Sequence, residues 1–447
     1  MPCRCAASGV SNPTARQLLE QYPTEGAALF FVGLVQKLQG EEEKPNTMTI
    51  QTGKGTITLW HLLAIWSISA IASLPGLAIS PILDDLHTIF PHSSELELQL
   101  VSSLPSLLII PFVLLAGKLT EGRERWPILM GGLALFLVSG VGCLLSHSLR
   151  ALLVWSCVMG IGAGMVIPLS TGLVAAYFTG DWRVRQLGYA SAINNLTLVG
   201  ATLLTSYLAT RSWHLPFLVY LLPAVSMVLC LTLRNQPEMP EPNESLQLRQ
   251  RQIDGRRLMA MMALYLFITY AVLVVSFDSS FLVAAYHINA HFSGWLIALF
   301  FLAIMLPGLV LNPIIRRLRS STNQLALLLT AFGLAVMGYA HSEVLLMVGA
   351  ISAGLGYGVM QPIIYDKTAT IAPPHQATLA LSCVMAMNYL AVLVAPLLLS
   401  ATHEVLHLHG EAAAFRLNAL LVALLFIVAS FHRKSFALGL DERYFVQ

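Results

Sequence analysis

Charged residues are scarce in this sequence. Only 11% of its 447 residues are Asp, Glu, Lys or Arg, whereas soluble globular chains carry about 25%. The composition is 56% hydrophobic, with a mean hydropathy of +0.71. A chain so poor in charge cannot cover a water-exposed surface, so most of it faces lipid or other apolar helices. The net charge of +2 is also too small to indicate a nucleic-acid partner.

The sequence also lacks the short motifs of enzymes, ATP-driven pumps and metal proteins. It contains no Gly-rich phosphate loop, no HExxH pair and no nucleophile motif. Six cysteines occur, but no spacing among them resembles a metal site or a disulfide framework. We therefore expect no catalytic activity, no cofactor and no metal, and we expect no ATP-driven motor within this chain.

Long apolar runs dominate instead. Twelve of them are long enough to cross a bilayer, which takes roughly 20 residues in a helix. They are continuously apolar, which excludes membrane strands with alternating apolar and polar residues. The predicted spans are 57–80, 98–117, 127–146, 151–178, 186–209, 213–233, 258–285, 293–315, 323–341, 343–366, 377–402 and 413–432.

One long polar stretch after residue 56 divides these runs six and six. Residues 234–257 carry three prolines and nine charges, so they cannot cross hydrocarbon and are typical of a solvated linker. We therefore predict an all-α integral membrane protein with twelve transmembrane helices in two pseudo-symmetric six-helix bundles. The bundles are residues 57–233 and 258–434, followed by a tail at 435–447.

Basic residues are distributed unevenly between the loops. If the N-terminus is inside, the inside segments hold 22 of the 25 Lys and Arg residues, and the outside segments hold only Arg150, Arg211 and Arg416. This positive-inside bias supports the span count. It also predicts cytoplasmic N- and C-termini in a cell inner (plasma) membrane. One missed span would exchange the sides of every later loop and spoil the asymmetry.

Residues 1–56 differ in character from the rest of the chain. Their apolar piece, residues 27–35, is too short to span a bilayer, and the segment lacks the organisation of a signal peptide. Met48 lies just ahead of the first span, so one hypothesis is that translation begins there and that residues 1–47 are upstream sequence. The alternative is a loosely held surface segment with a short interfacial helix.

A repeat with an offset of 194 residues relates the two bundles. The fourth and tenth spans share the pattern Gly-x-Gly-x-Gly-x-x-x-Pro. Its positions are Gly160, Gly162, Gly164, Pro168, Gly354, Gly356, Gly358 and Pro362. The same offset relates Asn194 to Asn388, and the basic pair after the second span to that after the eighth, which favours duplication. Glycines let helices approach closely and a late proline permits a bend, so we predict hinges here; plain helix packing is the alternative.

Together these features resemble the major facilitator superfamily of transporters, over about residues 57–434. The resemblance rests on the two six-helix halves, the central linker, the basic loops after the second and eighth spans, and the Gly-rich fourth span. Residues 213–217 (WHLPF) resemble the segment after the fifth span in efflux members, which favours an efflux-like bacterial branch. The antiporter signatures of the fourth and fifth spans are missing, so the resemblance does not establish antiport.

The family's loop signature after the second span is partly present. Gly117 and Arg125 match it, and Glu121 stands where the acid belongs, whereas three other positions depart. The resemblance implies a charge contact that locks the cytoplasmic gate, with Glu121 and Arg125 as candidates. Asp366, at the inner end of the tenth span, is a further gating candidate. Solvated loop residues are the alternative explanation for each.

A transporter of this kind is implied to bind substrate near mid-membrane, between the halves. Buried polar groups in the spans are costly and are therefore candidate binding residues. They are Asp278, Asn194, Asn195, Asn388, Gln361, Tyr365 and Trp66. Asp278 is the clearest carboxylate within a span and is a candidate carrier of a coupling proton. The alternatives are interhelical hydrogen bonds for the amides, an interfacial site for Asp278 and a lipid-facing position for Trp66.

The sequence thus favours a secondary transporter that exports a small molecule by alternating access, driven by an ion gradient, with the proton as the expected ion. Uptake by symport, or facilitated diffusion, of a small polar solute stays open because the antiporter signature is missing. A non-transporting receptor of the same fold is the less favoured alternative. The expected partners are a small-molecule substrate, the coupling ion and the lipid bilayer, with the protein a monomer.

Overall fold

The computed structural model describes residues 49–53, 55–77, 89, 95–121, 124–209, 211–235, 253–288, 291–405, 412–432 and 435–440. The chain divides into two compact units, Met1–Ile50 and Gln51–Gln447, and every helix discussed below belongs to the second. The predicted N-terminal segment (1–56) and linker (234–257) lie mostly outside the described residues, and residues 435–440 of the predicted tail (435–447) are described. The predicted domain division, including the two bundles, stays a prediction.

The first half of the chain contains two short strands followed by helices. In chain order the elements are β1 (Thr49–Gln51), β2 (Thr56–Thr58), α3 (Leu59–Ile71), α4 (Leu74–Leu77), α6 (Glu95–Leu119), α7 (Arg125–Leu144), α8 (Leu149–Tyr177), α9 (Gly180–Ala209), η3 (Leu215–Leu221), α10 (Pro223–Cys230) and η4 (Leu231–Asn235). The first predicted span, 57–80, becomes helical only at Leu59, because Thr56–Thr58 is a strand. The sixth, 213–233, is assembled from η3, α10 and η4, with prolines at the starts of η3 and α10.

The regular elements in the described part of the second half are all helices. Its elements are α12 (Gly255–Phe277), α13 (Ser279–Ala285), α14 (His291–Leu309), α15 (Leu311–Leu318), η5 (Arg319–Ser321), α16 (Thr322–Tyr339), α17 (Glu343–Ile371), η6 (Pro374–Gln376), α18 (Ala377–Val405) and α19 (Ala412–Phe431). Two predicted spans are interrupted rather than continuous. Span 258–285 breaks at Asp278, the C-cap of α12. Span 293–315 breaks at Val310, three residues after Pro307, which is inside α14.

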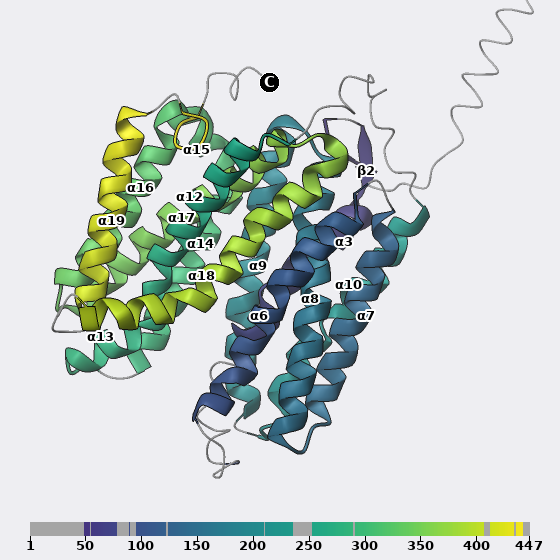
Figure 1. Cartoon of the computed structure of the whole chain (residues 1–447), viewed down its shortest axis with the longest axis horizontal. Helices are drawn as coiled ribbons and strands as arrows, with labels where there is room; N and C mark the ends of the chain where they lie inside the picture. Colours follow the sequence, from purple (N-terminus) through teal and green to yellow (C-terminus); the bar gives the residue numbers. More distant parts are fainter. Residues whose placement is uncertain are drawn as a thin grey trace, which may run out of the picture. The chain divides into compact units, whose positions relative to one another are not determined.

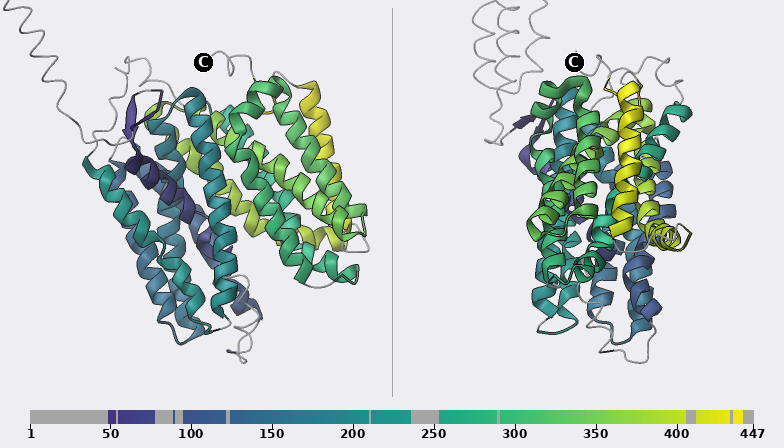
Figure 2. Two further views of the ribbon diagram at one scale, coloured as in Figure 1. Left: turned by 180° about the vertical axis from the view of Figure 1, so that it is seen from behind. Right: turned by 90° about the vertical axis from the view of Figure 1, so that its left-hand side faces the viewer.

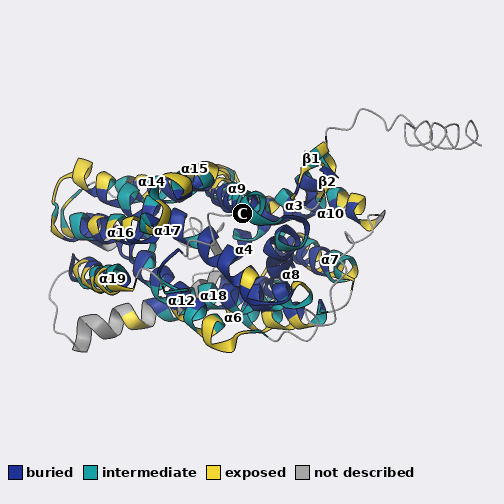
Figure 3. Ribbon diagram, turned by 90° about the horizontal axis from the view of Figure 1, so that it is seen from above, coloured by how far each residue is buried: buried dark blue, intermediate teal, exposed yellow. Residues whose placement is uncertain are grey.

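The outward surface of the helices is apolar. Among the described residues, ten helices are long and apolar enough to cross a membrane, and two shorter apolar helices, Leu59–Ile71 and Leu104–Leu119, accompany them. Large side chains such as Phe431, Trp295 and Met259 are 83%, 70% and 67% exposed. Figure 3 shows buried residues gathered between the helices and exposed ones on their outer faces. Such an outer surface suits lipid rather than water.

The repeat glycines pack α8 and α17 against equivalent neighbours. A Cβ added at Gly162 would lie 2.6 Å from the backbone nitrogen of Phe136 in α7. One added at Gly356 would lie 2.9 Å from the backbone nitrogen of Thr330 in α16. Phe136 and Thr330 are themselves 194 residues apart. Only glycine permits such backbone contact, and both helices run unbroken through their internal prolines. Close packing therefore accounts for these glycines, and the hinge role stays a prediction.

The two halves contact each other through α6 with α18 and through α9 with α14. A Cβ at Gly117 of α6 would lie 2.7 Å from Cβ of Ser382 in α18, and one at Gly188 of α9 would overlap the carbonyl oxygen of Gly308 in α14. Both contacts lie near the end where α6 and α14 finish and α9 and α18 begin. We call this the proximal end, and the opposite one the distal end. The ribbons of the halves lie close at the proximal end and diverge towards the distal end (Figures 1 and 2).

Candidate functional site

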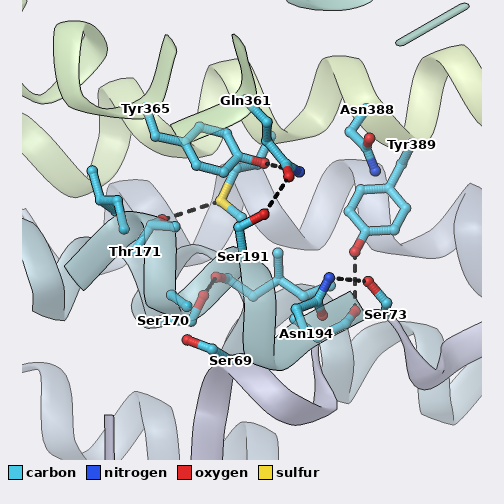
Figure 4. A pocket seen from close by; sticks show the side chains of 15 residues that line it. Ser69, Ser73, Ser170, Thr171, Ser191, Asn194, Gln361, Tyr365, Asn388 and Tyr389 are labelled. Atoms are coloured by element: carbon cyan, nitrogen blue, oxygen red, sulfur yellow. Dashed lines mark hydrogen bonds between the residues drawn. The ribbon is translucent and has the colours of Figure 1, made fainter. Parts of the chain in front are cut away.

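A pocket lies between the two halves, near the middle of α9 and α18. The segment around α3 and α4, with α8 and α9, contributes the wall from the first half, and α17 and α18 contribute the wall from the second. None of its 15 lining residues is Asp, Glu, Lys, Arg or His. Its polar side chains, which point towards one another in Figure 4, include Ser73, Ser191, Asn194, Gln361, Tyr365 and Asn388.

Pairs of lining residues are related by the 194-residue repeat. The pairs are Ile167 with Gln361, Thr171 with Tyr365, Ser191 with Met385, and Asn194 with Asn388. Positions that are equivalent in the two halves thus meet around one cavity. The repeat thus relates residues on the two sides of one pocket between the halves.

A chain of hydrogen bonds joins the halves along one wall of the pocket. Ser191 Oγ of α9 donates to Gln361 Oε1 of α17 over 2.8 Å, and Gln361 Nε2 donates to the hydroxyl of Tyr265 over 3.1 Å. Tyr265, in α12, is fully buried and lies 2.6 Å, hydroxyl to hydroxyl, from Tyr365. Buried polar groups that satisfy one another in this way hold a wall in one geometry.

The repeat-related asparagines, Asn194 and Asn388, are less completely paired. Asn194 Nδ2 donates to Ser73 Oγ over 2.6 Å, but its Oδ1 is buried without a hydrogen-bond partner among the described residues. Asn388 Oδ1 accepts from the Tyr265 hydroxyl over a long 3.5 Å. Tyr389, beside it, donates its hydroxyl to the carbonyl oxygen of Ala72 over 3.2 Å and so links the halves again. The pocket thus keeps hydrogen-bonding capacity on both walls.

Three predicted binding residues do not line this pocket. Asn195 is buried and donates to the backbone oxygen of Ser191, one turn earlier in its own helix. Trp66 donates from Nε1 to Gln186 over 3.0 Å and packs edge-on against Tyr189, within its own half. Asp278 is buried at the junction of α12 and α13, away from the lining residues. Of the predicted set, the pocket brings together Asn194, Asn388, Gln361 and Tyr365.

Polar contacts cross between the halves at the proximal end. Arg183 of α9 forms an ion pair with Asp366 of α17, at 2.5 Å from Nε to Oδ1. Asp366 is only 2% exposed, so the alternative that it is solvated is wrong. Glu121, after α6, accepts a hydrogen bond from Gln376 before α18. Arg125, the other predicted gate residue, makes no ion pair among the described residues, and its Nε is buried without a hydrogen bond.

A second ion pair crosses the halves at the proximal surface. Asp181, in the first turn of α9, pairs with Arg316 of α15, and Asn312 donates from Nδ2 to the Asp181 carbonyl oxygen over 2.8 Å. The side chains of Arg316 and Asp181 are 73% and 41% exposed, so water screens this pair far more than that of Arg183.

Lys367 makes its hydrogen bonds to residues 436–439 rather than to its neighbour Asp366. Its ammonium is buried and donates to the carbonyl oxygens of Phe436, Ala437 and Gly439 at 2.9, 3.3 and 2.6 Å. Asn323 adds a hydrogen bond from Nδ2 to the Leu438 carbonyl oxygen over 3.1 Å. Lys367 therefore fixes residues 435–440 to the second half.

The sequence interpretation missed several residues of the site, although signals for some were present. Applying the 194-residue offset to Gln361 and Tyr365 yields Ile167 and Thr171, both of which line the pocket. Tyr265 does not line the pocket. Its role is recognised only from the structure, where its hydroxyl contacts Tyr365 and Gln361. Arg183 is one of the basic residues predicted to lie in the inside segments, and nothing in its sequence neighbourhood indicates a partner 183 residues away.

The sequence profile of the Major Facilitator Superfamily matches residues 62–278 and 258–441, which together cover most of the chain. The chain belongs to the Major Facilitator Superfamily. The predicted family and its all-α, twelve-helix fold are thereby confirmed, and so is a multi-pass membrane transporter as the general class. Proteins of this family bind their substrates at a site between the two halves. The pocket described above has that position.

Relatives within the Major Facilitator Superfamily include several bacterial proteins. An uncharacterized MFS-type transporter, YceJ of Bacillus subtilis (strain 168), is 24% identical over 71% of this chain and 83% of its own length. The multidrug transporter protein MdtP of the same organism is 27% identical, over 33% of this chain and 26% of MdtP. The quinolone resistance protein NorA of Staphylococcus aureus is 30% identical, over 26% of this chain and 29% of NorA. The last two matches thus span less than a third of those relatives.

Solved structures of the superfamily share the fold. The human organic anion transporter MFSD10 (TETRAN) superposes with a TM-score of 0.64 at 18% identity, covering 83% of this chain and 97% of its own. The proton:xylose symporter XylE superposes with a TM-score of 0.62 at 13% identity, covering 84% and 95%. At these identities the likeness concerns the arrangement of helices alone.

Proposed function

We propose that this protein exports a small molecule across the cell inner (plasma) membrane by alternating access, coupled to the proton gradient. The observation that carries the proposal is the pocket lined by repeat-related residues of both halves. Rocking of one half against the other around such a pocket opens it to one side of the membrane at a time. In this proposal the protein works as a monomer, because each chain holds a complete pocket.

The proximal end is the cytoplasmic gate in this scheme, which agrees with the basic residues of the adjoining segments. Contacts between the halves there close the pocket on that side. To open it, the Arg183–Asp366 pair and the contact of Glu121 with Gln376 must separate. In this proposal Arg125, at the start of α7, belongs to the same gate, and the repeat glycines and prolines of α8 and α17 act as hinges.

Asp278 is the proposed proton carrier. It is a buried carboxylate at the junction of α12 and α13, and its own backbone caps α12 through a 2.9 Å hydrogen bond to the Val274 carbonyl oxygen. Buried carboxylates within membrane spans mark proton paths in many transporters. Because Asp278 is away from the pocket, proton binding acts on the substrate through the movement of α12 and not through direct contact.

Support for export comes from residues 213–217 and from the names of two relatives, a multidrug transporter and a quinolone resistance protein. A second candidate is uptake by symport, or facilitated diffusion, of a small polar solute. The uncharged, hydroxyl- and amide-rich pocket wall favours it. The two functions differ in the direction in which the proton moves relative to the solute.

Flux measured with purified protein in proteoliposomes tests the proposal. A ligand from a thermal-stabilisation screen should accumulate in vesicles that are acidic inside, because antiport exchanges solute for protons. Accumulation in vesicles that are alkaline inside would indicate symport, and flux without gradient dependence would indicate a facilitator. Binding without flux would contradict transport and favour a receptor.

The role of Asp278 has a matched test. Asp278→Asn should keep ligand binding and lose the dependence of flux on the pH gradient, whereas Glu343→Gln changes an exposed carboxylate at the start of α17 and should alter neither. Coupled transport that survives in Asp278→Asn would show that the proton binds elsewhere.

A further inference from the structure

The pocket leaves one buried hydrogen-bond acceptor without a partner. Asn194 Oδ1 is shielded from water and makes no hydrogen bond among the described residues, while Nδ2 of the same amide is occupied by Ser73. A buried acceptor left unpaired destabilises a structure, so such groups are kept where a ligand or water completes them. Asn194 lines the pocket. A molecule bound there can complete it by donating an O–H or N–H.

The opposite wall offers the complementary group. Asn388, the repeat equivalent of Asn194, lies on α18 and uses its Oδ1 for the contact with Tyr265. Its Nδ2 makes no hydrogen bond among the residues that the structure describes, which leaves two N–H donors for a ligand acceptor. The two amides come from opposite halves and line the same cavity (Figure 4).

The wall between the two amides contains no compensating charge. Its side chains are hydroxyl, amide, thioether and aliphatic groups, and two buried carboxylates of the second half, Asp278 and Asp366, are not among the lining residues. A charged ligand entering this pocket would lose its hydration without gaining a counter-charge, which is strongly unfavourable. A neutral ligand loses less hydration free energy on entering the pocket, and its hydrogen bonds to the pocket compensate for that loss.

We infer that the pocket binds an uncharged molecule that donates a hydrogen bond to Asn194 Oδ1 and accepts one from Asn388 Nδ2. This inference rests on the proposed transport function and specifies its substrate class. Because the two partners belong to different halves, such a ligand joins the halves at the pseudo-twofold axis. Release then requires only that one of the two amides withdraws as the halves rock.

A charge-matched compound panel tests the inference. Each scaffold is present in three forms at pH 7: a neutral alcohol or amide, a protonated amine and a carboxylate. Thermal stabilisation of the purified protein reports binding. Stabilising compounds should come mainly from the neutral set, and Asn194→Leu and Asn388→Leu should each weaken their binding by about tenfold or more. Asn195 is next in the chain but outside the pocket, so Asn195→Ala should change the affinity for these neutral compounds by no more than about twofold.

Introducing a charge provides the converse measurement. Asn194→Asp keeps a polar contact with Ser73, which then donates its hydroxyl, and adds a carboxylate to the pocket. This variant should bind protonated amines at least about tenfold better than the wild type. Asn388→Asp repeats the test on the other wall if the first variant fails to fold.

The outcomes separate the inference from the transport proposal. Preferential stabilisation by amines or carboxylates, binding that neither asparagine affects, or no stabilising compound in the panel would overturn the inference. Neutral ligands that bind through both asparagines but show no flux would uphold the binding site and contradict transport.

Discussion

The central pocket and the proximal end connect the same two halves by different chemistry. The pocket joins them through uncharged groups, with Ser191 donating to Gln361 and Tyr389 donating to Ala72. The proximal end joins them through ion pairs and glycine contacts, above all Arg183 with Asp366 and Gly188 with Gly308. Ion pairs therefore lie at the proximal end, where the halves are in close contact, and hydrogen bonds of neutral groups lie in the pocket that we propose as the ligand site.

This separation has a physical basis. Charged pairs and backbone contacts depend on distance, so they favour one closed geometry and are lost together when the helices part. Neutral hydrogen-bonding groups bind a ligand without attracting ions into the cavity. If the comparison is right, changes at the proximal end should alter the balance between conformations, while changes in the pocket should alter which ligands bind.

The buried ion pair should give the largest effect. Arg183→Gln or Asp366→Asn leaves the partner charge largely buried, with side chains that are 13% and 3% exposed, which costs on the order of 3–5 kcal/mol. The double variant removes both charges and should lose less than the sum of the single changes. Thermal unfolding in detergent and labelling of a cysteine placed at the proximal end measure stability and opening.

The exposed pair that joins the same halves is the matched control for this prediction. Asp181→Asn breaks a contact with Arg316 that is largely solvated, so the expected effect is about 0–1 kcal/mol. Equal effects of Asp181→Asn and Asp366→Asn would contradict the view that burial makes the Arg183 pair the stronger connection.

The sequence predicted the fold well because the signals for it are local and repeated. Apolar runs, a charged linker and a 194-residue offset require no knowledge of contacts, and the family match agrees with them. Interruptions were harder to predict. The break at Asp278 was not expected, because an apolar run continues on both sides of it.

The site was only partly predictable. Asn194 and Asn388 were found because polar residues in apolar spans stand out and the repeat relates them. Asn195 stands out equally, but its side chain donates a hydrogen bond to the Ser191 carbonyl oxygen of its own helix and does not line the pocket. The partner of Asp366 could not be predicted, since the contact with Arg183 depends on how α9 and α17 meet across the halves.

Packing between the halves gives the next largest effect. In Gly188→Ala the new methyl carbon would overlap the Gly308 carbonyl oxygen, so α9 and α14 must move apart. Overpacking of this kind costs about 1–3 kcal/mol. The matched control is Gly200→Ala in the same helix, where nothing lies within 4 Å and the change should be neutral or stabilising by up to about 1 kcal/mol. Similar unfolding temperatures for the two variants would contradict close packing of α9 on α14.

The smallest effect on closure of the proximal end should come from Lys367, which lies at that end but does not join the halves. Lys367→Met removes three charge-assisted hydrogen bonds to the Phe436, Ala437 and Gly439 carbonyl oxygens, and these oxygens can turn to water instead. Hydrogen exchange should therefore rise in residues 435–440 by about tenfold or more, because the segment opens locally. Flux and labelling of the proximal end should stay near wild type, since Asp366 keeps Arg183. A loss of proximal closure as large as that in Asp366→Asn would instead show that residues 435–440 are part of the gate. Contacts within one half would then matter for closure as much as contacts that join the halves.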